Sequence, residues 1–253
     1  MSSFAESGII AESTVVRSHD GLNIETYFAR PISREQVGSV VVLHHLPGYD
    51  EATKEIVRKL ASHGYAAACP NLYHRESPGM DADQAAEAAK GRGGVPDDQV
   101  VNDCAASARM LRALPYTNDK VAVMGFCSGG RQAFIAASSP EVTQIDAVVN
   151  CYGALTGSWP AEHPLASSAE VIDQVADLSA PMLGLFGKED VRPSTADVEA
   201  AREALSREGK TFEFHSFDGA GHAFFSVDRA AYRPAAATEG WRLVWNWLAT
   251  YLE

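Results

Sequence analysis

The chain has few cysteines and no cluster of basic residues. Its four cysteines form neither a C-x-x-C pair nor the spacing of a zinc site, which argues against a disulfide framework and favours a cytoplasmic protein with reduced thiols. Lysine and arginine number 21 against 33 aspartate and glutamate, a formal net charge of −12. We therefore expect neither nucleic acid nor an anionic membrane surface as a partner.

Long apolar runs are also missing. No apolar stretch has the length that a bilayer span requires, and residues 1–8 lack the basic-then-apolar pattern of a signal peptide. Hydrophobic residues make up 46% and charged residues 21%, as in ordinary globular enzymes. The 253 residues contain no evident repeat or linker, so we expect one domain over residues 1–253, as a monomer or small homo-oligomer.

Apolar strand patterns alternate with helical ones along most of the chain. This order predicts an α/β fold with a mostly parallel, doubly wound sheet and helices on both faces. Segments 14–18 and 22–30, around a turn at Asp20-Gly21, are expected to pair as an antiparallel hairpin at one sheet edge. Further strands are predicted at 39–44, 65–69, 120–126, 147–152, 181–186 and 211–217, and helices at 51–63, 82–90, 97–114 (capped by Asp97 or Asp98), 128–137, 195–207 and 238–252.

The most informative segment is Gly125-Phe-Cys-Ser-Gly-Gly130, directly behind the apolar run 121–124. It has the layout of a nucleophile elbow, G-x-S-x-G, with Cys127 in the place of serine. Glycines are needed there because the residue at the tip holds a strained backbone between a strand and a helix. The pattern predicts that Cys127 is a nucleophile at the carboxyl edge of the sheet, although a buried cysteine is often only a small apolar residue.

A cysteine nucleophile requires a base and a group that orients the base. Asp190 follows the predicted strand 181–186, and His222 follows strand 211–217 on a glycine-rich loop. Both therefore lie at the carboxyl edge, in the chain order nucleophile, acid, histidine. We predict His222 as general base and then acid, and Asp190 as the residue that fixes its tautomer, with loop capping as the alternative for Asp190. The predicted oxyanion donors are the N–H groups of Ser128 and Leu46.

These residues carry a family resemblance. The elbow, the segment Gly64-Tyr-Ala-Ala-Ala-Cys-Pro-Asn-Leu-Tyr73 and the segment Ala220-Gly-His-Ala-Phe224 resemble the dienelactone hydrolase family of the α/β-hydrolase fold. The resemblance implies hydrolysis of small esters or lactones with no cofactor and no metal. It places the family's triad on Cys127, Asp190 and His222.

The sequence departs from the family pattern at two positions. His45 stands where family members have a glutamate that gates the thiol, and Ser226 stands where they have an arginine that binds a substrate carboxylate. Arg75 matches a second family arginine. The loss of one arginine favours a less charged ester or lactone as substrate.

Five residues are predicted to bind substrate: His45, Arg75, Tyr152, Trp159 and Phe225. Each has a plain structural alternative, namely packing beneath a loop for His45, a surface ion pair for Arg75, and the hydrophobic core for the aromatic side chains. For the whole chain, the alternatives to a hydrolase are a redox sensor in which Cys127 forms a sulfenic acid, and a binding protein on a degenerate hydrolase scaffold.

Overall fold

The computed structural model describes residues 8–33, 35–76, 79–142, 144–156 and 170–253. Eight strands form one sheet in the order β1-β2-β4-β3-β5-β6-β7-β8. The strand β2 runs antiparallel to both its neighbours, and all other pairs are parallel, as the alternating pattern predicts. The strands are β1 (Ile9–Arg17), β2 (Asn23–Pro31), β3 (Val37–Leu43), β4 (Ala66–Pro70), β5 (Thr117–Phe126), β6 (Ala147–Cys151), β7 (Met182–Gly187) and β8 (Phe212–Phe217).

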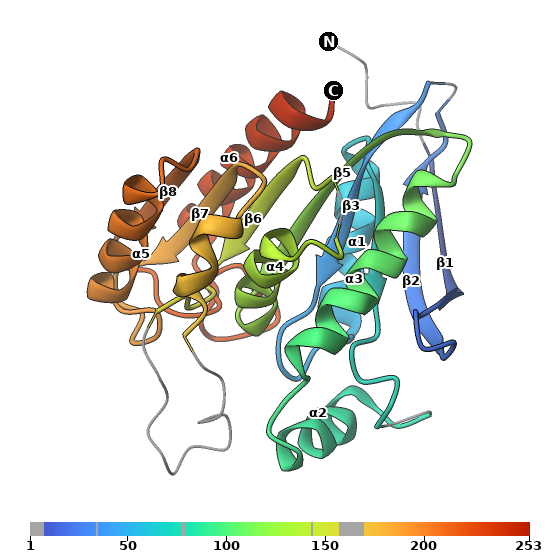
Figure 1. The fold of residues 1–253 in the computed structure, drawn as a ribbon, viewed down its shortest axis with the longest axis horizontal. Coiled ribbons are helices and arrows are strands. Elements are labelled where there is room, and N and C mark those ends of the chain that lie inside the picture. The colour runs from blue at the N-terminus through green and yellow to red at the C-terminus, as the bar shows by residue number, and fades with distance from the viewer. Residues whose placement is uncertain (1–7, 34, 77–78, 143, 157–169) are drawn as a thin grey trace.

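Helices cover both faces of the sheet. Figure 1 shows α3 and α4 in front of the strands and α1 and α6 behind them. The helices are α1 (Glu51–Ser62), α2 (Ala82–Gly91), α3 (Asp97–Arg112), α4 (Ser128–Ser138), α5 (Thr195–Arg207) and α6 (Pro234–Leu252), with the 3-10 helix η2 (Ile172–Asp177).

The central strands are apolar throughout because both of their sides are buried. Along β3, Val41 and Leu43 belong to the core cluster beneath α3, α4 and α5, whereas Val40 and Val42 belong to the cluster beneath α1 and α6. All four residues are fully buried. Such continuous burial is typical of parallel strands between two helical layers, and it confirms the predicted fold class.

Two predicted element boundaries and the predicted cap of α3 differ most from the structure. Strand β1 begins at Ile9 rather than residue 14, because most of this edge strand is exposed and its apolar signal is weak. Helix α3 is preceded by Pro96, and Asp97 and Asp98 lie in its first turn, where a negative charge favours the helix dipole. Helix α6 begins at Pro234 rather than residue 238, since proline suits the first helical position.

Candidate active site

Cys127 lies between β5 and α4 in a sharp turn. Its backbone has φ 55° and ψ −120°, a conformation that side-chain-bearing residues rarely adopt. Its N–H donates to Cys151 O at 2.9 Å, which ties the turn to the neighbouring strand β6. The side chain is only partly buried, in contrast to those of Cys69, Cys104 and Cys151. The turn therefore presents a strained, accessible thiol at the carboxyl edge of the sheet.

The glycines around Cys127 allow the backbone to approach closely. A Cβ atom on Gly125 would lie 1.9 Å from Gly129 O, and one on Gly129 would lie 2.1 Å from Leu43 O. A Cβ on Gly130 would lie 2.3 Å from Asn150 Oδ1. Side chains at these positions would push α4 away from β3 and β5, and the turn would lose its shape.

Asp190 and His222 form a close pair at the same edge. His222 Nδ1 lies 2.8 Å from Asp190 Oδ2, and the Asp190 side chain is 1% exposed. The loop between β8 and α6 is held by Glu189 N–H, which donates to Ala220 O at 2.9 Å. Gly187 permits this contact, because a Cβ there would lie 2.3 Å from Ala220 O. The pair therefore depends on two loops that follow neighbouring strands.

His222 and Cys127 line the same cavity, and the interaction with Cys127 acts on the pKa of the ring together with that of Asp190. Burial opposes a charge on the ring, but the hydrogen bond to Asp190 and the interaction with Cys127 outweigh it and raise the pKa of His222 to about 10. At neutral pH the ring therefore carries a proton. The structure thus brings together the three side chains that the sequence places in separate loops.

A cavity of about 560 Å³ opens over Cys127 and His222. Ser128 and Leu46, the predicted oxyanion residues, both line it. Ser128 is the first residue of α4, and the first N–H groups of a helix have no partner within the helix. Ser128 N–H is therefore available to a ligand oxygen beside the thiol.

His44 fixes the loop that contains Leu46. It is buried, its Nδ1 lies 2.9 Å from His45 O, and Leu72 N–H donates to its Nε2 at 3.1 Å. Burial lowers the pKa of His44 to about 4, so the ring is neutral and can donate from Nδ1 while it accepts at Nε2. One imidazole thus joins the loops that follow β3 and β4.

Sequence reasoning missed several residues of this cavity, among them Tyr73, Lys90, Arg131 and Arg192. Arg131 could have been found, since it lies four residues after Cys127, one turn along the predicted helix. It forms two hydrogen bonds with Asp97, at 3.0 and 3.2 Å. No local pattern marks Lys90 or Arg192, which reach the cavity from other loops and helices.

The predicted substrate-binding residues do not all lie around Cys127. Tyr152 lines the cavity, and its ring packs edge-on against His222 with the centroids 5.1 Å apart. His45 and Phe225 line a second cavity instead, which shares the Tyr152 wall. His45 Nε2 lies 3.1 Å from Asp50 Oδ2 and 3.2 Å from the Arg229 guanidinium. Trp159 lies outside the described residues.

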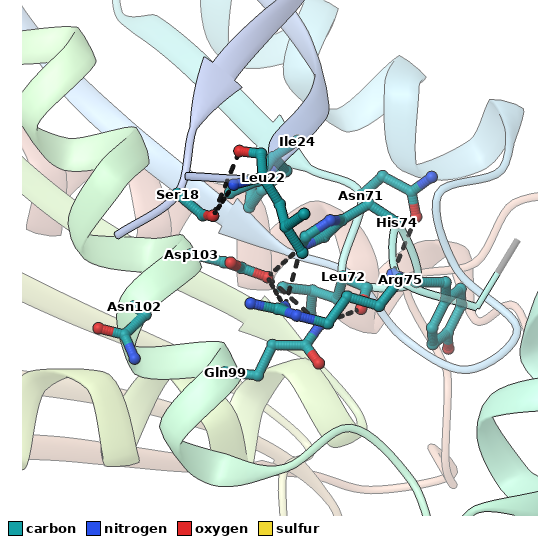
Figure 2. A network of polar contacts seen from close by, with 12 residues as sticks. Ser18, Leu22, Ile24, Asn71, Leu72, His74, Arg75, Gln99, Asn102 and Asp103 are labelled. Carbon is teal, nitrogen blue, oxygen red and sulfur yellow. Dashed lines mark hydrogen bonds and ion pairs between the residues drawn. The ribbon is translucent and has the colours of Figure 1, made fainter. Parts of the chain in front are cut away.

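Arg75 belongs to a network of polar contacts rather than to either cavity. Figure 2 shows its guanidinium beside His74 and Asp103. Its nitrogen atoms lie 3.0 Å from His74 Nε2, 2.7 Å from Asp20 Oδ2 and 3.6 Å from the fully buried Asp103. The positive charge of Arg75 is thus paired with two carboxylates. These ion pairs hold the loop after β4 to the β1–β2 turn and to α3. A role in substrate binding remains a prediction that this geometry does not support.

Membrane-spanning helices and clusters of metal ligands are both absent from the described part of the chain. None of the helices there is long and apolar enough to cross a membrane. Within the same residues, no group of three or more His, Cys, Asp or Glu side chains is placed to hold a metal ion.

Comparisons with known proteins agree with the geometry. The model of the dienelactone hydrolase family matches residues 24–252. A protein of Escherichia coli (strain K12) named "Putative carboxymethylenebutenolidase" is 33% identical over 249 residues, which cover 97% of this chain and 89% of that protein. A protein of the same name from Methylorubrum extorquens is 32% identical and covers 96% and 82%.

A solved structure is similar along the whole fold. The crystal structure of a "Putative Dienelactone Hydrolase" from Klebsiella pneumoniae subsp. pneumoniae is 31% identical, has a TM-score of 0.81, and covers 96% of this chain and 100% of that chain. The chain belongs to the dienelactone hydrolase family, and its enzyme class is that of the ester and lactone hydrolases.

Proposed function

We propose that the protein hydrolyses small esters or lactones through a thioester on Cys127, with His222 and Asp190 completing a catalytic triad. The observation that carries this proposal is the position of His222, whose ring is bonded to Asp190 and lines the same cavity as Cys127. A histidine oriented by a carboxylate and in contact with a nucleophile is the arrangement that acyl transfer requires.

In the first half of the reaction, the proton on His222 is the one that the Cys127 thiol has given up, and the sulfur attacks the substrate carbonyl carbon as a thiolate. The oxyanion accepts hydrogen bonds from the N–H groups of Ser128 and Leu46, each worth about 3 kcal/mol of barrier. The C–O bond then breaks, and the proton on His222 passes to the leaving alkoxide. In a lactone the resulting hydroxyl group stays attached to the acyl chain.

In the second half, His222 takes a proton from water, and the hydroxide attacks the thioester carbonyl. The C–S bond breaks, the carboxylic acid leaves, and the thiolate of Cys127 is restored beside the protonated His222. The pKa of about 10 for His222 fits a ring that is already protonated when the leaving group departs. Asp190 accepts the hydrogen bond from His222 Nδ1 and fixes the ring tautomer.

The proposed substrates are small and not strongly charged. Ser226 offers no cation at the position of the family arginine, and two cations of the cavity are paired, Arg131 with Asp97 and Lys90 with Glu87. Turnover of p-nitrophenyl esters and lactones, each with and without a carboxylate on the acyl side, tests this point. A strong preference for the carboxylate would contradict it.

The mechanism itself is tested with Cys127→Ala and with rapid-mixing kinetics. We expect Cys127→Ala to lose at least a thousandfold in kcat with p-nitrophenyl acetate while its circular dichroism stays unchanged. In the unmodified protein, acid quenching and mass spectrometry should detect an acetyl group on the peptide that contains Cys127. Turnover retained by Cys127→Ala would refute the assignment.

The redox alternative has weaker support. Cys151 lies on the neighbouring strand, but its side chain is fully buried, and burial raises its pKa well above the usual range. A buried, protonated thiol is a poor resolving partner for a sulfenic acid. Reaction of Cys127 with peroxide that is faster than its acylation by p-nitrophenyl acetate would favour the redox function.

A further inference from the structure

A second cavity of about 450 Å³ lies between α1 and the segment that joins β8 to α6. Its walls include four aromatic side chains, Phe126, Tyr152, Phe225 and Trp241, each less than 9% exposed. The volume and the apolar lining are those of ligand pockets. Cys127 is not among the lining residues, so this cavity is distinct from the one over the thiol.

The aromatic rings form one continuous wall. The rings of Phe225 and Trp241 meet edge-on with centroids 5.4 Å apart, and those of Phe126 and Phe225 meet edge-on at 5.9 Å. The Trp241 ring is also stacked on Trp245, with centroids 4.8 Å apart, so a further planar group would meet its edge together with the ring of Phe225. An aromatic ligand would therefore find the packing geometry that these side chains already use among themselves.

Lys59 places a cation beside this aromatic wall. The Lys59 ammonium lies 4.4 Å from the centroid of the Trp241 ring, and burial lowers the pKa of Lys59. In the part of the chain that the structure describes, no carboxylate forms an ion pair with Lys59. The other two charges at the cavity, Glu55 and Arg58, attract each other. The net positive charge of the side chains around this cavity therefore comes from Lys59, which is partly desolvated and lies beside the Trp241 ring.

We propose that this cavity binds a small aromatic carboxylate, with its ring against Phe225 and Trp241 and its carboxylate on Lys59. Desolvation makes an ion pair stronger than on the open surface, and the ligand's ring supplies the apolar contact. Tyr152 is the wall common to both cavities: it lines this one beside Ser226, while its ring packs against His222. Tyr152 would therefore stand between the ligand and His222, and the ligand would not reach Cys127.

The test uses benzoate as the probe and the Cys127→Ala protein, so that binding is measured independently of turnover. We expect saturable quenching of tryptophan fluorescence, confirmed by calorimetry, with one benzoate per chain. Benzamide, which has the same shape and no charge, should bind about tenfold more weakly. Lys59→Gln should weaken benzoate about tenfold, and Ala52→Trp, which places a large ring in the cavity from α1, should abolish binding.

Two controls distinguish this cavity from binding elsewhere on the protein. Lys54→Gln removes a lysine from the same helix that does not line the cavity, and it should leave benzoate affinity unchanged. Alkylation of Cys127 with iodoacetamide in the unmodified sequence should also leave it unchanged. Absence of saturable binding, equal affinity in Lys59→Gln, or loss of binding on alkylation would each overturn the proposal. Failure of the thioester mechanism would show in turnover alone and would leave these measurements unaffected.

Discussion

Gly125 lies directly against the backbone of Gly129, so that a Cβ on Gly125 would stand 1.9 Å from Gly129 O. This contact joins the end of β5 to the first turn of α4 and encloses Cys127 between them. The two glycines thus set the shape of the turn, and their substitution gives the first prediction.

We expect Gly125→Ala and Gly129→Ala each to lower the free energy of unfolding by about 3 kcal/mol, because backbone atoms cannot move aside as a flexible side chain can. Urea denaturation measures the change. Gly91→Ala is the matched control, since Gly91 lies in α2 with nothing within 4 Å of its added Cβ. There we expect a gain of about 0.5–1 kcal/mol. If all three variants changed the free energy of unfolding equally, the close approach of Gly125 and Gly129 would not be what limits these positions to glycine.

Asn150 stabilises the turn that contains Tyr152. Its buried amide accepts from Gly153 N–H at 2.7 Å and donates to Gly153 O at 3.0 Å, and Tyr152 has φ 45° between them. Asn150→Ala leaves both backbone groups without these partners, so we expect a loss of about 3 kcal/mol in unfolding free energy.

The same variant should lower kcat, because Tyr152 packs against His222. Asn102→Ala removes one bond, to Asp98 O at 2.8 Å on the surface of α3, and should cost less than about 0.5 kcal/mol. An Asn150→Ala protein as stable and active as the parent would show that the turn holds without the amide.

His44 should make the protein sensitive to acid. Its pKa is lowered from the ordinary value of 6.5 to about 4 in the fold, so between these values the unfolded chain binds a proton that the folded chain does not. Stability is therefore lost as the pH falls from about 6.5 to 4, by about 3 kcal/mol in total. Urea titrations of the parent and of His44→Gln at pH 7 and pH 4.5 test this. The advantage of the parent over the variant should shrink at pH 4.5, and an unchanged difference would contradict a neutral, buried imidazole.

His222 should show the opposite dependence. Its pKa is raised from 6.5 to about 10, so the folded chain holds a proton that the unfolded chain releases. The resulting stability is fully present below pH 6.5 and is lost as the pH rises to 10. The stability difference between the parent and His222→Asn should therefore fall across this window. Asp190→Asn removes the carboxylate bonded to the ring and should weaken the same dependence. A difference that stays constant from pH 6 to pH 10 would refute the protonated ring.

Local patterns predicted much of the fold. Continuous apolar runs such as 121–124 identified the buried strands, and Gly125, Cys127 and Gly129 identified the elbow, because a strained turn admits few residue types. The antiparallel pairing of edge strand β1 with β2 was predicted, but the first half of β1 was missed, since its exposed residues carry little apolar periodicity. The order of strands also predicted that Asp190 and His222 lie at one edge, because the ends of parallel strands meet there.

The sequence by itself determined the family, the α/β architecture and the three side chains that meet at Cys127. Only the tertiary structure decided where the remaining candidates lie: Arg75 in a partly exposed ion-pair network, and His45 and Phe225 in a cavity apart from the thiol. The physical reason is the distance along the chain over which the deciding interactions act. Strand and turn patterns are set by neighbours along the chain, whereas the cavity that a side chain enters depends on how distant helices such as α1 and α6 pack against the sheet.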